Sequence, residues 1–235
     1  LDDIRACIGC NQACSGHGLH GFPISCIQYP ESGREIEFPR SSPAQQARRV
    51  MVVGGGPAGL KAAAVAAERG HEVCLYERER QLGGQVLLAQ RLPSRAEFGG
   101  LATNLTRECE LSGVRIFTDT EVSAAMVRSQ SPDAVVIATG GTPYIPQLGG
   151  AVEAHVLTSW QVLKGEANVG ASVVIADSRG DWIGPALAEL LAAAGSRVRL
   201  CVSAPNPADT IQQYVRDLLV ARAHGLGVEF IPYAR

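Results

Sequence analysis

The chain of 235 residues is long enough for one large domain or two small ones, and with 46% hydrophobic residues it can bury a sizeable core. Its formal net charge of −2 argues against nucleic acid or an acidic membrane surface as the main partner. No apolar run approaches the roughly 18–20 residues of a membrane-spanning helix, and the charged start of the chain is unlike a signal peptide.

Residues 1–47 are predicted to form a loop and a linker. This segment is rich in Gly, Pro, Ser and Cys and shows no period of helix or strand, and residues 39–43 are typical of a linker. Because the chain opens without Met, we expect a processed chain or a fragment of a longer protein.

Regular periodicity begins directly after this segment and predicts two Rossmann-like domains in tandem. Residues 48–150 should form the first, a parallel sheet with crossover helices. Its expected strands are 49–53, 72–76, 114–117 and 134–138, and its expected helices are 57–69 and about 95–112. Residues 151–235 should form a second, incomplete domain. Its expected strands are 172–176, 197–201 and 228–231, and its expected helices are 183–194 and 210–224.

The distribution of the seven cysteines indicates a reducing compartment. Four crowd near the start, whereas Cys74, Cys109 and Cys201 are scattered through apolar stretches. A secreted disulfide scaffold spreads its cysteines over a small domain instead. We therefore expect a cytoplasmic protein in which the scattered three are ordinary core or surface residues.

The cysteine loop, residues 7–26, has the spacing of iron–sulfur ligands. The pattern is Cys7-x2-Cys10-x3-Cys14-x11-Cys26. A cubane cluster needs four thiolates directed around one small volume, and the first three cysteines lie close enough together to wrap one. Cys26 would close the site from the far side of a loop that contains Gly16, Gly18 and Gly21. These glycines would let backbone N–H groups approach the sulfurs.

Two alternatives compete with a 4Fe–4S cluster in this loop. Structural zinc sites built from four cysteines usually show two separated CxxC pairs, and the second pair is absent here. Four free cysteines are the other alternative. His17 or His20 could replace a ligand, but loop histidines are more often solvated. The sequence therefore favours a cluster bound by the four cysteines.

A dinucleotide fingerprint follows the first predicted strand. Gly54 permits the tight turn, Gly56 lets the backbone approach a pyrophosphate, and Gly59 allows the helix to pack against the strand. Pro57 and Ala58 open the helix, whose N-terminus favours phosphate. Glu77 ends the next strand, where an acid binds ribose hydroxyls.

The fingerprint by itself leaves FAD, NAD and free ADP open. Gly84 and Gln85, in a loop expected to run along the nucleotide, favour an FAD-type site, and so do Thr139 and Gly140 at the end of a later strand. Arg78 could suggest a 2′-phosphate, but the neighbouring acid would repel one. We therefore expect Arg78 to pack over the adenine or to be exposed.

The corresponding second turn, residues 177–184, is degenerate. Its first position is Asp177 rather than glycine, and Asp181 is a second carboxylate where a pyrophosphate would lie. The next strand ends in Val202 and Ser203, with neither a ribose-binding acid nor a phosphate-binding Arg. Binding of NAD(P) at this turn is therefore doubtful.

In order and spacing, these motifs resemble the Old Yellow Enzyme-type iron–sulfur flavoproteins, the NADH:flavin oxidoreductase family of 2,4-dienoyl-CoA reductase, trimethylamine and histamine dehydrogenases and N-demethylases. The resemblance covers essentially the whole chain, which looks like the C-terminal half of such a protein. The matching stretches are residues 7–14, 23–26, 33–35, 54–59, 82–85, 138–140 and 158–163. One departure is Tyr29 before Pro30, where the family often has Asn.

The resemblance implies an α/β fold in which an iron–sulfur loop precedes tandem Rossmann-like FAD/NAD(P)-binding domains. It also implies that a TIM barrel outside this chain holds FMN and the substrate, and that the cluster exchanges single electrons with that FMN. The Rossmann domain would hold FAD in a reductase or ADP in an amine dehydrogenase. The positions that match nucleotide contacts of the family are Ala58, Glu77, Gln85, Arg95 and Val122.

The leading hypothesis is the electron-transfer portion of a flavin- and iron–sulfur-dependent oxidoreductase of the amine dehydrogenase or N-demethylase type. Electrons would leave through the cluster to an external carrier such as an electron-transfer flavoprotein. One alternative is an NAD(P)H-dependent enoate reductase like 2,4-dienoyl-CoA reductase, and another is a non-catalytic module that binds ADP. We predict no catalytic residue in this chain and no activity of the chain alone, because the substrate site would lie on the barrel.

Overall fold

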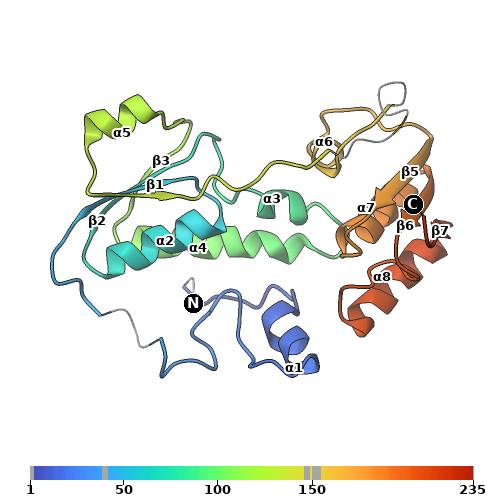
Figure 1. Ribbon diagram of the computed structural model, residues 1–235, viewed down its shortest axis with the longest axis horizontal. Helices are drawn as coiled ribbons and strands as arrows, with labels where there is room; N and C mark the ends of the chain where they lie inside the picture. The colour runs from blue at the N-terminus through green and yellow to red at the C-terminus, as the bar shows by residue number, and fades with distance from the viewer. Residues whose placement is uncertain (1–2, 39–41, 146–148, 150–154, 235) are drawn as a thin grey trace. The chain divides into compact units, whose positions relative to one another are not determined.

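The computed structural model describes residues 3–38, 42–145, 149 and 155–234. The chain divides into two compact units (Figure 1). Unit 1 comprises Leu1–Gln90 and Arg95–Thr142, and unit 2 comprises Arg91–Ser94 and Pro143–Arg235. Both are mixed α/β units with parallel strands, as the sequence predicts.

Unit 1 is built on a four-stranded parallel sheet in the order β3-β2-β1-β4. The strands are β1 (Arg49–Val53), β2 (Glu72–Tyr76), β3 (Arg115–Phe117) and β4 (Ala134–Ile137). In register, Val52 pairs with Leu75 on one side and with Val136 on the other. Val52 and Leu75 are fully buried, which explains why these strands read as continuous apolar runs.

Helices α2 (Pro57–Glu68) and α4 (Gly99–Leu111) lie side by side on one face of this sheet (Figure 1). The short helix α5 (Ala124–Gln130) lies on the other side. Pro57 at the first position starts α2, and a run of alanines favours the helix while allowing close packing. Ala63, Ala64 and Cys109 are fully buried where α2 meets α4 and the sheet. Helices α3 (Val86–Ala89) and η2 (Ala96–Phe98) connect β2 to α4.

The start of the chain contains two short helices, η1 (Gln12–Gly16) and α1 (His17–Leu19). The expectation of a purely loop-like segment was therefore wrong over these residues. Asn11, in the left-handed region at φ 55°, begins the helical run, and Gly21 at φ 74° follows it. Such short turns leave no periodic pattern in the sequence, because they bury only Gly16.

Unit 2 contains a three-stranded parallel sheet in the order β5-β6-β7. Its strands are β5 (Ser172–Asp177), β6 (Arg197–Val202) and β7 (Glu229–Ile231), and its helices are α6 (Ser159–Lys164), α7 (Ile183–Ala193) and α8 (Gln213–Gly225). A capping box between Thr158 and Gln161 starts α6. Residues 91–94 also belong to this unit, where Arg91 donates to the carbonyl of Leu163 at 2.6 Å.

All predicted strands are present within one or two residues of their expected bounds. The last predicted helix, however, begins at Gln213 rather than at residue 210. Its expected first residue, Thr210, uses both its N–H and its hydroxyl to bind the carbonyl of Gly180, and Ala208 is in the left-handed region at φ 55°. These tertiary contacts hold the segment out of the helix.

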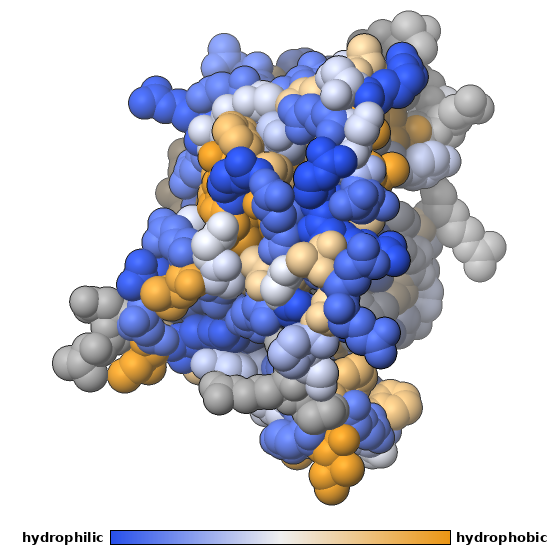
Figure 2. All heavy atoms as spheres, turned by 90° about the vertical axis from the view of Figure 1, so that its left-hand side faces the viewer, coloured by the Kyte–Doolittle hydropathy of each residue, from blue (hydrophilic) through white to orange (hydrophobic). Residues whose placement is uncertain are grey.

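The surface of the chain in Figure 2 is mainly hydrophilic, with its apolar side chains in separate groups. Within the described ranges, no helix is long and apolar enough to cross a membrane. The linker predicted at residues 39–43 lies mostly outside the described residues, since 39–41 are not described.

Candidate nucleotide site and cysteine loop

The fingerprint turn, residues 54–59, connects β1 to α2 and can be built only from glycine at its critical positions. Gly54 has φ 109°, its N–H donates to the carbonyl of Tyr76 at 2.8 Å, and a Cβ there would lie 2.3 Å from the carbonyl oxygen of Ala138. A Cβ on Gly59 would lie 1.9 Å from the carbonyl oxygen of Gly54. Helix α2 therefore packs directly on the turn, and its positive end faces the space where a phosphate would bind.

Glu77, at the end of β2, is held rigidly beside this turn. Glu77 is only 9% exposed, and one of its carboxylate oxygens accepts a hydrogen bond from the N–H of Gly55 at 2.6 Å. The other oxygen accepts the N–H of Glu79 at 2.9 Å. A carboxylate has about four lone-pair positions, so two backbone bonds leave capacity for ribose hydroxyls. The structure thus presents the predicted acid next to the predicted glycines.

The loop that follows β2 closes on the fingerprint turn. The N–H of Gly83 donates to the carbonyl of Gly55 at 2.8 Å, and the Gly84 Cα lies 4.0 Å from where a Cβ on Gly56 would be. The amide of Gln85 lies near Gly140 and donates to the carbonyl of Gly141 at 3.4 Å. The loop therefore lies between the turn and the end of β4, as expected for a nucleotide-binding loop.

The structure gathers only part of the predicted nucleotide set. Gly54, Gly56, Pro57, Ala58, Gly59, Glu77, Gly84, Gln85 and Gly140 lie around the turn. Arg78 is exposed and pairs with Glu79 at 3.4 Å, and Arg95 lies over the ring of Phe98 at 5.0 Å. Val122 is half-buried, whereas the exposed Thr139 lies beside the turn, with its backbone nitrogen 3.1 Å from where a Cβ on Gly54 would be. For every residue of the predicted set, contact with a nucleotide stays a prediction.

Two glycines that the sequence reasoning did not select also shape the site. A Cβ on Gly55 would lie 2.5 Å from Leu82, and a Cβ on Gly83 would lie 2.9 Å from both Ala102 and Leu87. Gly83 also has φ 123°. The runs of consecutive glycines at 54–56 and 83–84 are the sequence pattern that could have identified Gly55 and Gly83.

Cys10 lies close enough to the other three cysteines of the loop for their charges to affect it. Burial raises the pKa of the Cys10 thiol, and the charges of Cys14, Cys26 and Cys7 raise it further. A backbone hydrogen bond from Gln12 lowers it, and the N–H of Gly9 donates to the Cys7 sulfur at 3.4 Å. The loop therefore brings four thiols together and already directs backbone donors at two of them, which suits a cluster of thiolate-bound iron.

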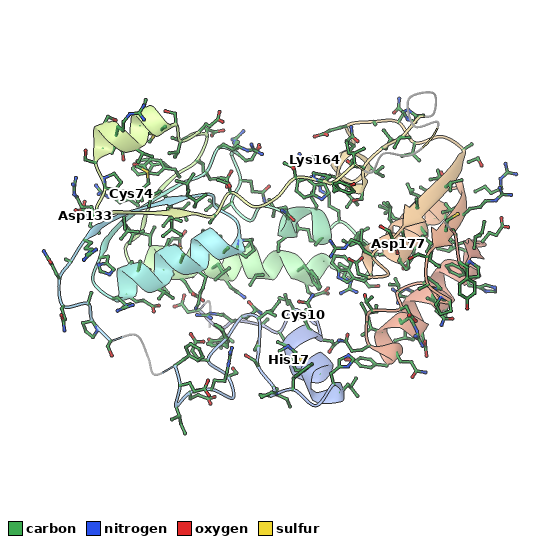
Figure 3. All side chains as sticks on the ribbon, in the orientation of Figure 1. Cys10, His17, Cys74, Asp133, Lys164 and Asp177 are labelled. Carbon is green, nitrogen blue, oxygen red and sulfur yellow. The ribbon has the colours of Figure 1, made fainter. Side chains whose placement is uncertain are left out.

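A cluster and a single ion need different separations of the thiols. Tetrahedral zinc would hold its sulfurs about 3.8 Å apart, given Zn–S bonds of about 2.3 Å. In the described part of the chain, no three His, Cys, Asp or Glu side chains are arranged to hold one metal ion. A cubane holds its thiolates further apart, and the assignment of the loop to a cluster rather than to zinc stays a prediction. His17, labelled in Figure 3, donates through Nδ1 to the carbonyl of Pro23 at 3.0 Å.

The second turn, residues 177–184, is filled by its own carboxylates. One oxygen of Asp177 accepts the N–H groups of Arg179 and Gly180 at 2.9 and 3.1 Å. Its other oxygen lies 2.4 Å from where a Cβ on Gly184 would be, and it is buried without a hydrogen-bond partner among the described residues. Asp181 accepts the N–H of Ile183 at 2.9 Å. These N–H groups are the ones that would bind a pyrophosphate.

The segment after β6 closes over the same turn. Thr210 donates to the carbonyl of Gly180 through its N–H at 3.0 Å and through its hydroxyl at 2.8 Å. Gly180 is buried, and so is Ala208. In a Rossmann domain the ribose lies at this strand end, so the chain itself occupies the place of a nucleotide.

Burial raises the pKa of Asp177, and the neighbouring charge of Asp181 raises it further. Because the pKa of Asp177 is higher in the folded than in the unfolded protein, the folded state favours the protonated side chain. This contribution to stability is complete below the unfolded pKa of about 3.9, and it is lost as the pH rises through the folded pKa. We therefore expect Asp177→Asn to raise the unfolding temperature at about pH 8 and to change it little at about pH 4. Thermal unfolding at both pH values would measure this.

The matched control is Asp217→Asn, because Asp217 is exposed and pairs with Arg216 on the surface. This variant should show no such pH dependence. A loss of stability in Asp177→Asn at about pH 8 would contradict the expectation and show that the turn needs the ionised carboxylate.

Comparison with known proteins identifies a family and similar proteins for this chain. Residues 48–235 match the family described as "Pyridine nucleotide-disulphide oxidoreductase". The chain is 40% identical over 200 residues to a "Probable N-methylproline demethylase" of Rhizobium meliloti (strain 1021), covering 85% of this chain and 29% of that protein.

Two solved structures resemble the chain over its whole length. A 2-naphthoyl-CoA reductase complex matches with a TM-score of 0.91 at 27% identity, covering 100% of this chain and 35% of that one. Histamine dehydrogenase from Rhizobium sp. 4-9 matches with a TM-score of 0.88 at 27% identity, covering 99% of this chain and 38% of that one. The chain thus spans about a third of the length of these proteins.

Proposed function

The chain belongs to the pyridine nucleotide-disulphide oxidoreductase family, and from this premise we propose that it is the electron-transfer part of an iron–sulfur flavoprotein. It corresponds to the C-terminal half of the Old Yellow Enzyme-type iron–sulfur flavoproteins and is part of an oxidoreductase. The observation that carries the proposal is the gathering of the three other thiols around Cys10, in the same unit as the nucleotide turn.

The cysteine loop would hold the redox centre. Bound by Cys7, Cys10, Cys14 and Cys26, a 4Fe–4S cluster would exchange single electrons with an FMN on a separate barrel domain or subunit and with an external carrier. The chain's own contribution is to supply the thiolates and to direct the N–H groups of Gly9 and Gln12 at two sulfurs. Such N–H donors stabilise the negative charge of a reduced cluster.

Exposed apolar side chains in the segment that carries the cysteines support a barrel partner. Large side chains that are more than half exposed concentrate on residues 3–38: Ile4, Leu19, Phe22, Ile24, Ile36 and Phe38. Ile36 alone is 97% exposed. Apolar groups gathered in this way usually mark an interface, and the full-length relatives are about three times as long as this chain. We propose that the FMN-bearing domain covers them.

The nucleotide site of unit 1 is an FAD-type site, and we propose that it binds FAD or the ADP that FAD contains. Glu77 would hold the adenosine ribose, and the N-terminus of α2 would bind the pyrophosphate. Gly84 and Gln85 would lie along the nucleotide, since this loop contacts the turn and the end of β4.

The filled second turn favours relay to an external carrier over reduction by NAD(P)H. Asp177 and Asp181 use the N–H groups that a pyrophosphate would need, and they would repel its charge. The amine-oxidising relatives point the same way, since one is a probable N-methylproline demethylase and another is a histamine dehydrogenase. We propose the same class of enzyme, with an electron-transfer flavoprotein or similar one-electron carrier as acceptor.

The test is to denature anaerobically purified protein, identify the released nucleotide by chromatography, and titrate the intact protein with NADH and NADPH by calorimetry. We expect FAD or ADP, its loss in Glu77→Ala but not in the exposed-site control Glu79→Ala, and no binding of NADH or NADPH. Tight NADPH binding to unit 2 would overturn the relay and favour a reductase, the activity of the 2-naphthoyl-CoA reductase relative. Zinc without iron would leave only an ADP-binding structural module.

A further inference from the structure

We propose that Gln28 and Arg5 are positioning residues that clamp the cysteine loop onto α4, and that α4 connects this loop to the nucleotide loop at Gly83. The proposal rests on the proposed function, because the clamped segment carries the four cysteines. It assigns a role to buried polar groups that neither the cysteine spacing nor the fingerprint explains.

Gln28 ties the two ends of the cysteine loop to each other and to α4. It is 5% exposed and lies two residues after Cys26. Its amide nitrogen donates to the carbonyl of Ala6, directly before Cys7, at 2.5 Å. Its amide oxygen accepts from Asn104 on α4 at 2.8 Å. A single side chain therefore fixes the backbone next to the first and the last cysteine against the same helix.

Arg5 adds a buried charge network to this clamp. It donates to the carbonyl of Gln28 at 2.8 Å, lies over the ring of Tyr29 at 4.1 Å, and forms an ion pair with Glu108 on α4. Lys61 on α2 also pairs with Glu108, at 3.2 Å. The side chains of Arg5 and Glu108 are only 17% and 9% exposed, so removal of Glu108 would leave the charge of Arg5 largely buried without its carboxylate partner.

Helix α4 reaches from this clamp to the nucleotide loop. Ile8, buried between the first two cysteines, packs against Gly100, where a Cβ would lie 3.6 Å from its side chain. Two residues along the helix, Ala102 touches Gly83, whose N–H donates to the fingerprint turn at Gly55. One rigid helix of 13 residues therefore contacts both sites. Movement of the loop on α4 would change the separation of cluster and nucleotide and the solvent exposure of the sulfurs.

The exposure and hydrogen bonding of its sulfurs set the reduction potential of a cluster. A loosened clamp should therefore alter the potential without removing a ligand. The informative variant is Gln28→Leu, which keeps the side-chain size but leaves Ala6 and Asn104 without their partner. The matched control is Arg107→Gln, because Arg107 also joins α4 to the start of the chain, but through an exposed ion pair with Asp3.

Two readouts test the clamp in the full chain. In cluster-free protein, amide hydrogen exchange over residues 6–28 should accelerate at least about tenfold in Gln28→Leu and stay unchanged in Arg107→Gln. In cluster-loaded protein, the midpoint potential and the electron paramagnetic resonance spectrum should change in the first variant only, with bound nucleotide retained. If Gln28→Leu does not fold, Asn104→Ala tests the bond to α4 by the same measurements.

Unchanged exchange and an unchanged potential in Gln28→Leu would overturn the proposal. Wild-type protein that binds no iron would instead overturn the proposed function. Amide hydrogen exchange in the cluster-free chain would still test the clamp in that case.

Discussion

Replacing Cys10 by serine is expected to abolish cluster binding, lowering iron from about four atoms per chain to nearly none after anaerobic reconstitution. The charges of all three other cysteines of the loop raise the pKa of Cys10, so Cys10 lies near each of them. Serine keeps the size but supplies an alcohol that is a poor ligand for iron. Iron and acid-labile sulfide analysis, with the visible absorption spectrum, would measure the loss.

The matched control for this variant is Cys74→Ser. Cys74 is half-buried on β2 and lies outside the cysteine loop, as Figure 3 shows. This variant should keep its iron and sulfide in full. Retention of iron in Cys10→Ser, or stoichiometric zinc in the wild type, would contradict the assignment of the loop to a 4Fe–4S cluster.

Replacing Gly54 by alanine is expected to empty the nucleotide site and to lower stability. The new Cβ would lie 2.3 Å from the carbonyl oxygen of Ala138 and would sit on a residue with φ 109°. Backbone strain of this kind costs about 1–3 kcal/mol, and relief of the clash would move the turn away from β4. We expect an unfolding temperature about 5–10 °C lower and almost no FAD or ADP in purified protein.

Substitutions at two other glycines separate the effect of backbone strain on stability from the loss of nucleotide. Gly70 has φ 90° but no atom within 4 Å of an added Cβ, so Gly70→Ala should show the strain without the loss of nucleotide. Gly141, near the site, has open space around an added Cβ and no positive φ, so Gly141→Ala should change neither quantity. Nucleotide retained at full occupancy in Gly54→Ala would contradict the placement of the phosphates at this turn.

The sequence by itself determined the elements that local patterns specify. Apolar runs located the strands β1, β4 and β5. Burial on both faces explains the run in β1, whereas alternate residues of β4 and β5 are exposed. The fingerprint located the first turn, because only glycine tolerates the conformation of Gly54 and the approach of Gly59. The same pattern located Glu77 at the strand end beside the turn, and its binding of ribose stays a prediction. The spacing of the cysteines indicated a cluster, which stays a prediction until iron is measured.

Only the tertiary structure decided the features that depend on contacts between distant residues. The clamp joins Gln28 to Asn104, which lie 76 positions apart in the chain, and Thr210 leaves its predicted helix because it binds Gly180, 30 positions earlier. Residues 91–94 lie in unit 2 although the residues on both sides of them lie in unit 1. No periodicity or spacing rule reports such pairs, because each depends on how separate elements pack. The two carboxylates of the second turn are visible in the sequence. Only the fold shows that they accept hydrogen bonds from the N–H groups of this turn.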